Sequence, residues 1–92
     1  MLEEFEEQNL TEQQLVDQTI RAARDSVWVI TDELQKKSEN NETLTRDGRG
    51  NIERNVAHLE LVMSNSKNVE LGGDLSDITA AIAAGKAALT TE

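Results

Sequence analysis

His58 is the side chain best suited to acid–base chemistry, because it is the only histidine among 92 residues. An imidazole that acts as a general base needs a group that orients it and a nucleophile that it activates. Its neighbours on the same helical face offer neither a carboxylate nor a hydroxyl; they are Arg54, Asn55, Leu61 and Val62. We therefore interpret His58 as a partly exposed helical residue and expect that the chain is not an enzyme.

Two short glycine-containing stretches have some features of a site for a metal ion or a phosphate, but each has a residue that does not fit such a site. Residues 47–51 (DGRGN) would need alternating oxygen ligands to bind calcium, but Arg49 occupies the third position. Gly72-Gly73 is followed by Asp74, whose charge would repel a phosphate. The chain also has no cysteine, and so no thiolate ligand and no disulfide. We expect no catalytic residue, no metal site and no cofactor.

The charge of the chain limits its partners. Eighteen acidic and nine basic residues give a formal net charge of -9, which repels nucleic-acid phosphates and anionic lipid headgroups. No apolar stretch approaches the length of a membrane span or a signal-peptide core. We therefore expect no direct nucleic-acid binding, no membrane contact and a cytoplasmic location.

The spacing of apolar residues predicts three helices, at about residues 11–37, 51–65 and 75–90. Thr11 and Gln14 have the form of a capping box at the start of the first helix. Asn51 is a plausible N-cap for the second helix, and Asp74 or Ser76 for the third. Within each helix the apolar residues recur every three or four positions and form a seam for a facing helix. The seam residues are Val16, Ile20, Ala23, Val27, Ile30, Leu34, then Ile52, Val56, Leu59, Met63, then Leu75, Ile78, Ile82, Gly85 and Leu89.

The connection between the first two helices is predicted at residues 38–50. This stretch is polar, and it contains Asp47-Gly48, a tight-turn signal. We therefore expect an all-α fold, either a small three-helix bundle or a helical hairpin with a third helix. Residues 11–92 form a single helical domain in this interpretation, preceded by an acidic N-terminal arm at residues 1–10.

The core of such a domain is thin. Hydrophobic residues make up 37% of the chain and aromatic residues 2%, with Phe5 and Trp28 as the only rings. Small scaffolds with little core are commonly stabilised by oligomerisation or by docking on a partner. We therefore expect a protein partner, either further copies of the chain or a larger structural protein.

The third helix is the first candidate interface. Glycine inside a helix costs about 1 kcal/mol relative to alanine, and Gly85 lies on the seam with Ile78, Ile82 and Leu89. A second helix that approaches closely, from the same chain or a neighbour, would offset this cost. The alternative is that the alanines of residues 80–88 are simply good helix formers.

Three large apolar residues are further interface candidates. Leu2 and Phe5 lie three residues apart in the acidic arm, which is either a solvated segment or an anchor for a groove of another subunit. Trp28 lies beside Val27 and close to Ile30 in sequence. It either widens the core, which is the interpretation we favour, or faces outward as an interface anchor.

Two stretches resemble a class of short proteins encoded by tailed bacteriophages. Residues 54–63 (RNVAHLELVM) match their Asn-x-x-His-Leu helix, and residues 74–89 (DLSDITAAIAAGKAAL) match an acidic turn followed by an Ala-Ala-Ile-Ala-Ala-Gly-Lys helix. The resemblance implies a phage setting, in the host cytoplasm or the virion, and a role in virion assembly. It implies no catalytic residue, and it makes His58 part of a structural signature.

Together these observations favour a non-enzymatic structural or assembly protein, for example a minor virion component, that acts through protein–protein contacts. The alternative is a small acidic regulator that binds a host protein and mimics the charge of a nucleic-acid backbone.

Overall fold

The structure is a computed structural model that describes residues 11–90, and within this range all regular structure is helical. The three long helices are α2 (Glu12–Glu39), α3 (Arg46–Ser64) and α5 (Ser76–Thr90), and a short helix, α4 (Ser66–Leu71), precedes α5. The predicted all-α fold is confirmed. The acidic arm, with Leu2 and Phe5, lies outside the described residues.

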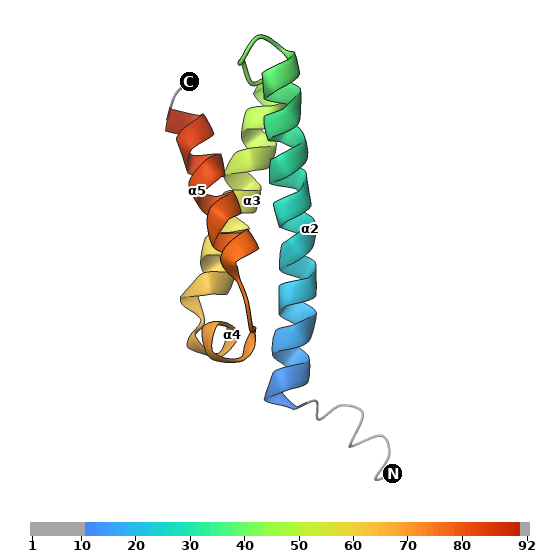
Figure 1. Cartoon of the computed structure of the whole chain (residues 1–92), viewed down its shortest axis with the longest axis vertical. Helices are drawn as coiled ribbons and strands as arrows, with labels where there is room; N and C mark the ends of the chain where they lie inside the picture. The colour runs from blue at the N-terminus through green and yellow to red at the C-terminus, as the bar shows by residue number, and fades with distance from the viewer. Residues whose placement is uncertain (1–10, 91–92) are drawn as a thin grey trace.

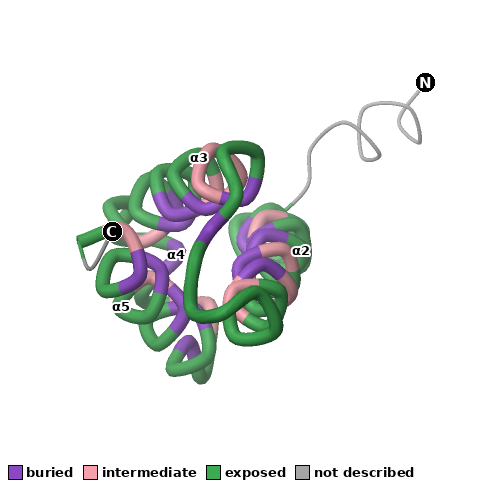
Figure 2. The backbone as a smooth tube through the Cα atoms, turned by 90° about the horizontal axis from the view of Figure 1, so that it is seen from above, coloured by how far each residue is buried: buried purple, intermediate pink, exposed green. Residues whose placement is uncertain are grey.

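The three long helices pack side by side as an up–down–up bundle (Figure 1). α2 and α3 are antiparallel, and α4 reverses the chain at the far end of α3, so that α5 runs in the same direction as α2 (Figure 1). Figure 2, which views the bundle along its length, shows the buried positions of the helices turned towards a shared centre. The largest fully buried side chains at this centre are Ile30, Ile52, Leu59 and Ile78.

α2 begins at the predicted capping box. The Thr11 hydroxyl accepts the backbone amide of Gln14 at 3.1 Å, and the Gln14 side-chain oxygen accepts the backbone amide of Thr11 at 2.9 Å. Two amides that have no partner within the helix are satisfied in this way. The predicted seam of α2 is also confirmed, since all its members are buried or half-buried.

α3 begins five residues earlier than predicted, at Arg46 instead of Asn51. Thr45 is the N-cap, and its hydroxyl accepts the backbone amide of Gly48 at 3.0 Å. The expected loop at residues 38–50 is therefore wrong. The chain turns instead within the short connection at residues 40–45, where Asn41 and Glu42 adopt left-handed backbone angles, with φ of 55° and 62°.

The glycine at position 48 has a packing role that explains this error. A capping box places glutamate or glutamine at the third position of the helix, and here that position is Gly48. A β-carbon at Gly48 would lie 2.9 Å from Oε1 of Glu33, a buried side chain of α2. Gly48 therefore leaves room for a carboxylate from the neighbouring helix instead of marking a turn.

α4 was not predicted. Asn65 ends α3 and also caps α4, because its side chain accepts the backbone amide of Lys67 at 2.9 Å. The buried Asn68 side chain donates to the carbonyl of Val62 at 2.8 Å, and Gln13 of α2 donates to the carbonyl of Leu71 at 2.8 Å. These bonds fix the reversal between α3 and α5 against the start of α2.

α5 follows the predicted seam, and the neighbours that cover it belong to the same chain. Ile78 is fully buried and Gly85 is buried, while Ile82 and Leu89 are half-buried against the core. The close approach expected at Gly85 is made by α3. The outward alanines Ala80, Ala83, Ala84 and Ala87 are exposed. Their propensity for helix is sufficient to account for them.

Candidate interaction surfaces

Trp28 is two-thirds exposed, with 66% of its surface accessible, and the expectation that it widens the core is wrong. Successive residues of an α-helix are separated by about 100° around its axis. Trp28 is therefore turned by about 200° from the buried Ile30, two residues later. Its position beside Val27 in sequence did not place it on the buried face. The other interpretation, an outward-facing residue that can anchor an interface, fits this exposure.

A second apolar surface lies where α2, α3 and α4 meet. Leu61 is 71% exposed and Leu15 is 50% exposed. Leu61 lines a shallow hollow, here called the Leu61 hollow, and Leu15 lies one turn before Thr19, which also lines it. Neither leucine belongs to a predicted seam. A large apolar residue outside the spacing of the buried seam is the sequence signal that could have identified Leu15 and Leu61 as exposed. The Leu61 hollow is lined by Thr19, His58, Leu61, Val62, Ser64, Asn65 and Asn68.

His58 is exposed on α3 and is part of this hollow. The residues that line the hollow with it are polar amides, hydroxyls and apolar side chains, with no carboxylate among them. Among residues 11–90 no group of three or more His, Cys, Asp or Glu side chains is placed to hold a metal ion. The arrangement around His58 therefore offers shape and apolar area for binding, without an orienting acid for the imidazole.

A polar hollow lies at the first turns of α3, at the opposite end of the bundle. It is lined by Arg46, Asp47, Gly50, Asn51 and Arg54, and is here called the arginine hollow. These residues lie within nine positions of one another, but the sequence did not indicate that they share a concave surface.

A chain of hydrogen bonds holds Arg54 in the arginine hollow. The buried carboxylate of Glu33 accepts the Asn51 side-chain amide at 2.8 Å through Oε2. The Asn51 side-chain oxygen in turn accepts Nη2 of Arg54 at 2.6 Å. Gly50 leaves space beside this guanidinium, since a β-carbon there would lie 3.2 Å from Nη1 of Arg54. An acid on α2 thus positions a cation on the surface of α3.

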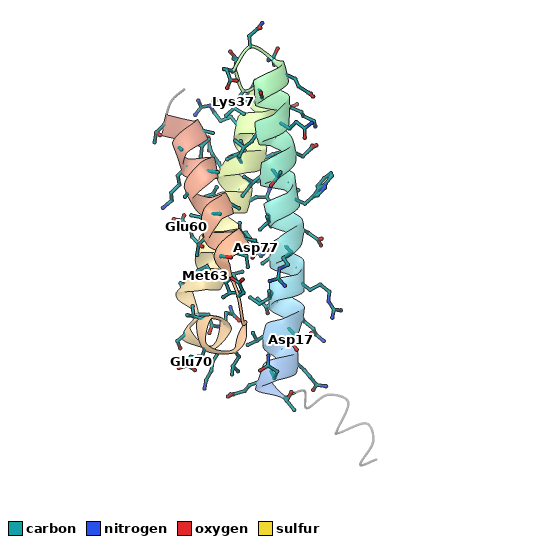
Figure 3. All side chains as sticks on the ribbon, in the orientation of Figure 1. Asp17, Lys37, Glu60, Met63, Glu70 and Asp77 are labelled. Carbon is teal, nitrogen blue, oxygen red and sulfur yellow. The ribbon has the colours of Figure 1, made fainter. Side chains whose placement is uncertain are left out.

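Ion pairs between helices occupy much of the remaining basic charge. Arg24 of α2 contacts Asp77, at the start of α5, at 3.0 Å, and Lys86 of α5 pairs with Glu60 of α3. Figure 3 labels the acids of these two pairs, Asp77 on α5 and Glu60 on α3. Arg24 also donates to the carbonyl of Asp74 at 3.2 Å. The carboxylates and cations in these pairs are well exposed, so each pair contributes little stability. They join helix faces that the apolar core already brings together.

Of the interface candidates on α5, Ile78 and Gly85 lie inside the core of the chain itself, and Ile82 and Leu89 are only half-exposed. Trp28 is the predicted candidate that the structure places on the surface, whereas Leu2 and Phe5 lie outside the described residues. None of the described helices combines the length and the hydropathy required to cross a bilayer. No protein-family model, curated protein or solved structure matches the chain.

Proposed function

We propose that the chain is a non-enzymatic structural or assembly protein that acts through contacts with other proteins. The observation that carries this proposal is the 66% exposure of Trp28, the only tryptophan of the chain, on the 28-residue helix α2. Tryptophan is among the residues that dominate binding energy at protein interfaces. A rigid helix presents it without a cost for ordering a loop.

The Leu61 hollow supports the same proposal. Large apolar side chains that cluster on the surface of a small soluble domain are typical of protein–protein contacts. Leu15 and Leu61 both lie at this end of the bundle, and Thr19, one turn after Leu15, lines the hollow beside Leu61. The bundle therefore offers protein partners an exposed tryptophan, Trp28, and an apolar surface around Leu61.

The resemblance of residues 54–63 and 74–89 to short tailed-phage proteins supports a role as a minor virion component. Mass spectrometry of purified virions tests this part, and the absence of the chain from such particles would contradict it. The net charge of -9 favours a second candidate, a small acidic regulator that binds a host protein. Binding by such a regulator weakens as the ionic strength rises, whereas an apolar contact through Trp28 persists.

The proposal is tested by light scattering on the purified chain and on the Trp28→Gln variant over the same range of concentrations. We expect the molar mass of the wild type to rise with concentration more steeply than that of the variant. The exposed Val69→Gln substitution on α4 is the matched control, because it removes an exposed apolar residue elsewhere. Equal masses for the wild type and Trp28→Gln at every concentration would count against a Trp28 contact.

A further inference from the structure

We propose that the arginine hollow binds the acidic residues 1–10 of a second copy of the chain, so that copies associate end to end. This inference rests on the proposed function, because it names one protein partner for a chain that acts through protein contacts. The ligand class is a peptide carboxylate, and the groups that receive it are the guanidinium groups of Arg46 and Arg54.

The first argument is the charge that remains available. Several basic residues have partners among residues 11–90: Arg24, Lys36, Lys37, Lys67 and Lys86 form ion pairs, and Arg49 also has an interaction. Arg46 and Arg54 form no ion pair within that range, yet they line one hollow. In a chain with a net charge of -9, two arginines that share a hollow without a paired acid are a specific place for an anionic group.

The second argument is that Arg54 is held in place within the hollow by neighbouring side chains. Glu33 is buried and orients Asn51, and Asn51 accepts Nη2 of Arg54 at 2.6 Å. A guanidinium that is fixed on one edge keeps its other N–H groups free to donate to a carboxylate. Gly50 keeps the space beside Nη1 of Arg54 open.

The third argument is the chemistry of residues 1–10. This segment, MLEEFEEQNL, has four glutamates and no lysine or arginine. The glutamates occur as consecutive pairs, Glu3-Glu4 and Glu6-Glu7, so each pair offers two carboxylates within a short stretch. Asp47 also lines the hollow, and it disfavours a ligand with a compact, multiply charged group more than it disfavours separated carboxylates.

The fourth argument is distance, which favours a second copy over the chain's own arm. Glu33 accepts a hydrogen bond from Asn51 of the hollow, so it marks the height of the hollow along α2. It lies 22 residues after Thr11, which corresponds to about 33 Å along the helix axis at 1.5 Å per residue. Arg54, one turn after Asn51 on the antiparallel helix α3, lies about 5 Å nearer to Thr11. Glu7 is four residues before Thr11 and reaches about 14 Å at most, and Glu3 covers the distance only when the arm is fully extended, at about 28 Å. Figure 1 shows the start of α2 and the start of α3 at opposite ends of the bundle.

Such a contact joins two different surfaces of identical copies. It therefore builds a ring if the rotation between copies closes, and an open chain if it does not. Because the contact is carried by exposed charges, it must weaken strongly as added salt shortens the screening length.

The test uses paramagnetic relaxation in a mixture of two full-length chains. The chain has no cysteine, so a Gln8→Cys variant can carry a single nitroxide in its arm. This spin-labelled chain is made at natural isotope abundance and is mixed with a ¹⁵N-enriched chain that carries no nitroxide. We expect broadening of the Gly48, Gly50 and Asn51 amide signals in the ¹⁵N copy, and loss of this broadening in about 1 M salt. Broadening that is absent, or that survives high salt, overturns the proposal.

Substitutions locate the contact. Arg46→Gln with Arg54→Gln in the ¹⁵N copy should reduce the intermolecular broadening by about threefold to tenfold, the effect of losing two exposed ion pairs. Arg21→Gln is the matched control, because Arg21 lines a different hollow with Asp17 and Gly72, and it should leave the broadening unchanged. Replacement of Glu3, Glu4, Glu6 and Glu7 by glutamine in the labelled copy should remove the broadening without altering the helical bundle. Broadening that is unchanged in either set of variants overturns the proposal.

The outcome separates this inference from the proposed function. If the mass rises with concentration and depends on Trp28 but the arm label broadens nothing in the arginine hollow, only the end-to-end contact is wrong. If the broadening appears as expected but Trp28→Gln changes neither self-association nor partner binding, the Trp28 contact is wrong and the arginine hollow stands.

Discussion

Gly85 of α5 lies so close to Val56 of α3 that a β-carbon on Gly85 would stand 2.5 Å from Cγ2 of Val56. The next nearest atom is Cγ2 of Ile52, at 3.3 Å, followed by Cγ2 of Ile30 of α2 at 3.6 Å. One missing methyl group therefore allows α5 to approach both other long helices. The alanine-rich helix is slim on this face because its own chain packs against it.

Gly85→Ala should lower the free energy of unfolding by about 1–3 kcal/mol, the usual cost of overpacking. Intrinsic helix propensity alone predicts the opposite sign, a gain of about 1 kcal/mol. Urea unfolding measures the difference, and Ala84→Gly, on the exposed face, serves as the propensity control with a loss of about 1 kcal/mol. Val56→Ala removes the opposing methyl group, so Gly85→Ala should cost less in that background. The same cost in both backgrounds would show that the two residues are not in close contact.

Glu33→Ala should destabilise the chain by about 1–3 kcal/mol. The substitution leaves the half-buried Asn51 side-chain amide without its acceptor, and a donor that is partly shielded from water carries a desolvation cost when it is left unpaired. Glu33→Gln keeps an oxygen acceptor in the same place and should cost less. The control is Glu53→Ala, an exposed glutamate of α3, for which a change within about 0.5 kcal/mol is expected in chemical denaturation. Similar losses for the Glu33 and Glu53 alanine variants would mean that the Glu33–Asn51 contact does not support the fold.

Asp74 should make the start of α5 sensitive to pH. Its carboxylate accepts the backbone amide of Ser76 at 3.0 Å, and this hydrogen bond holds the pKa of Asp74 below its usual value. A carboxylate with a lowered pKa in the folded state adds stability above its unfolded-state pKa, and this contribution is lost as the pH falls through the folded-state pKa. Asp74→Ala should therefore lower the melting temperature at neutral pH, with a difference that shrinks on acidification to below that pKa.

Thermal melts from neutral to strongly acidic pH measure this effect. Asp25→Ala removes an exposed carboxylate of α2 and corrects for the change in net charge. A difference between the wild type and Asp74→Ala that stays constant across the pH range, after this correction, would rule out the ionised carboxylate as its source.

The sequence predicts an element well where the spacing of apolar residues along the helix matches the face that is buried in the bundle. The seam of α2 and the Thr11 capping box follow from residues within a few positions of one another, and both are confirmed. The start of α3 could not be read in this way, because Gly48 and Gly50 are turn signals in isolation. Their role depends on Glu33, a residue from another helix, and on Arg54.

The candidate surfaces were predicted less well, because exposure depends on how the helices are rotated against one another. Trp28 is next to two half-buried valines in sequence, yet the geometry of the helix turns it outward. The position of Arg54 in the arginine hollow depends on the observed register of α2 and α3, in which Glu33 meets Asn51. Apolar spacing indicates which residues can face a core but does not set this register.

The fluorescence of Trp28 tests the central claim most directly, because it is the only tryptophan and reports on its own surroundings in the unmodified chain. In dilute solution we expect the emission of a solvent-exposed indole that acrylamide quenches readily. As the chain assembles or binds its protein partner, the emission should shift to shorter wavelength and the quenching should fall, in step with the molar mass from light scattering. Emission and quenching that stay constant while the mass rises would contradict a contact through Trp28.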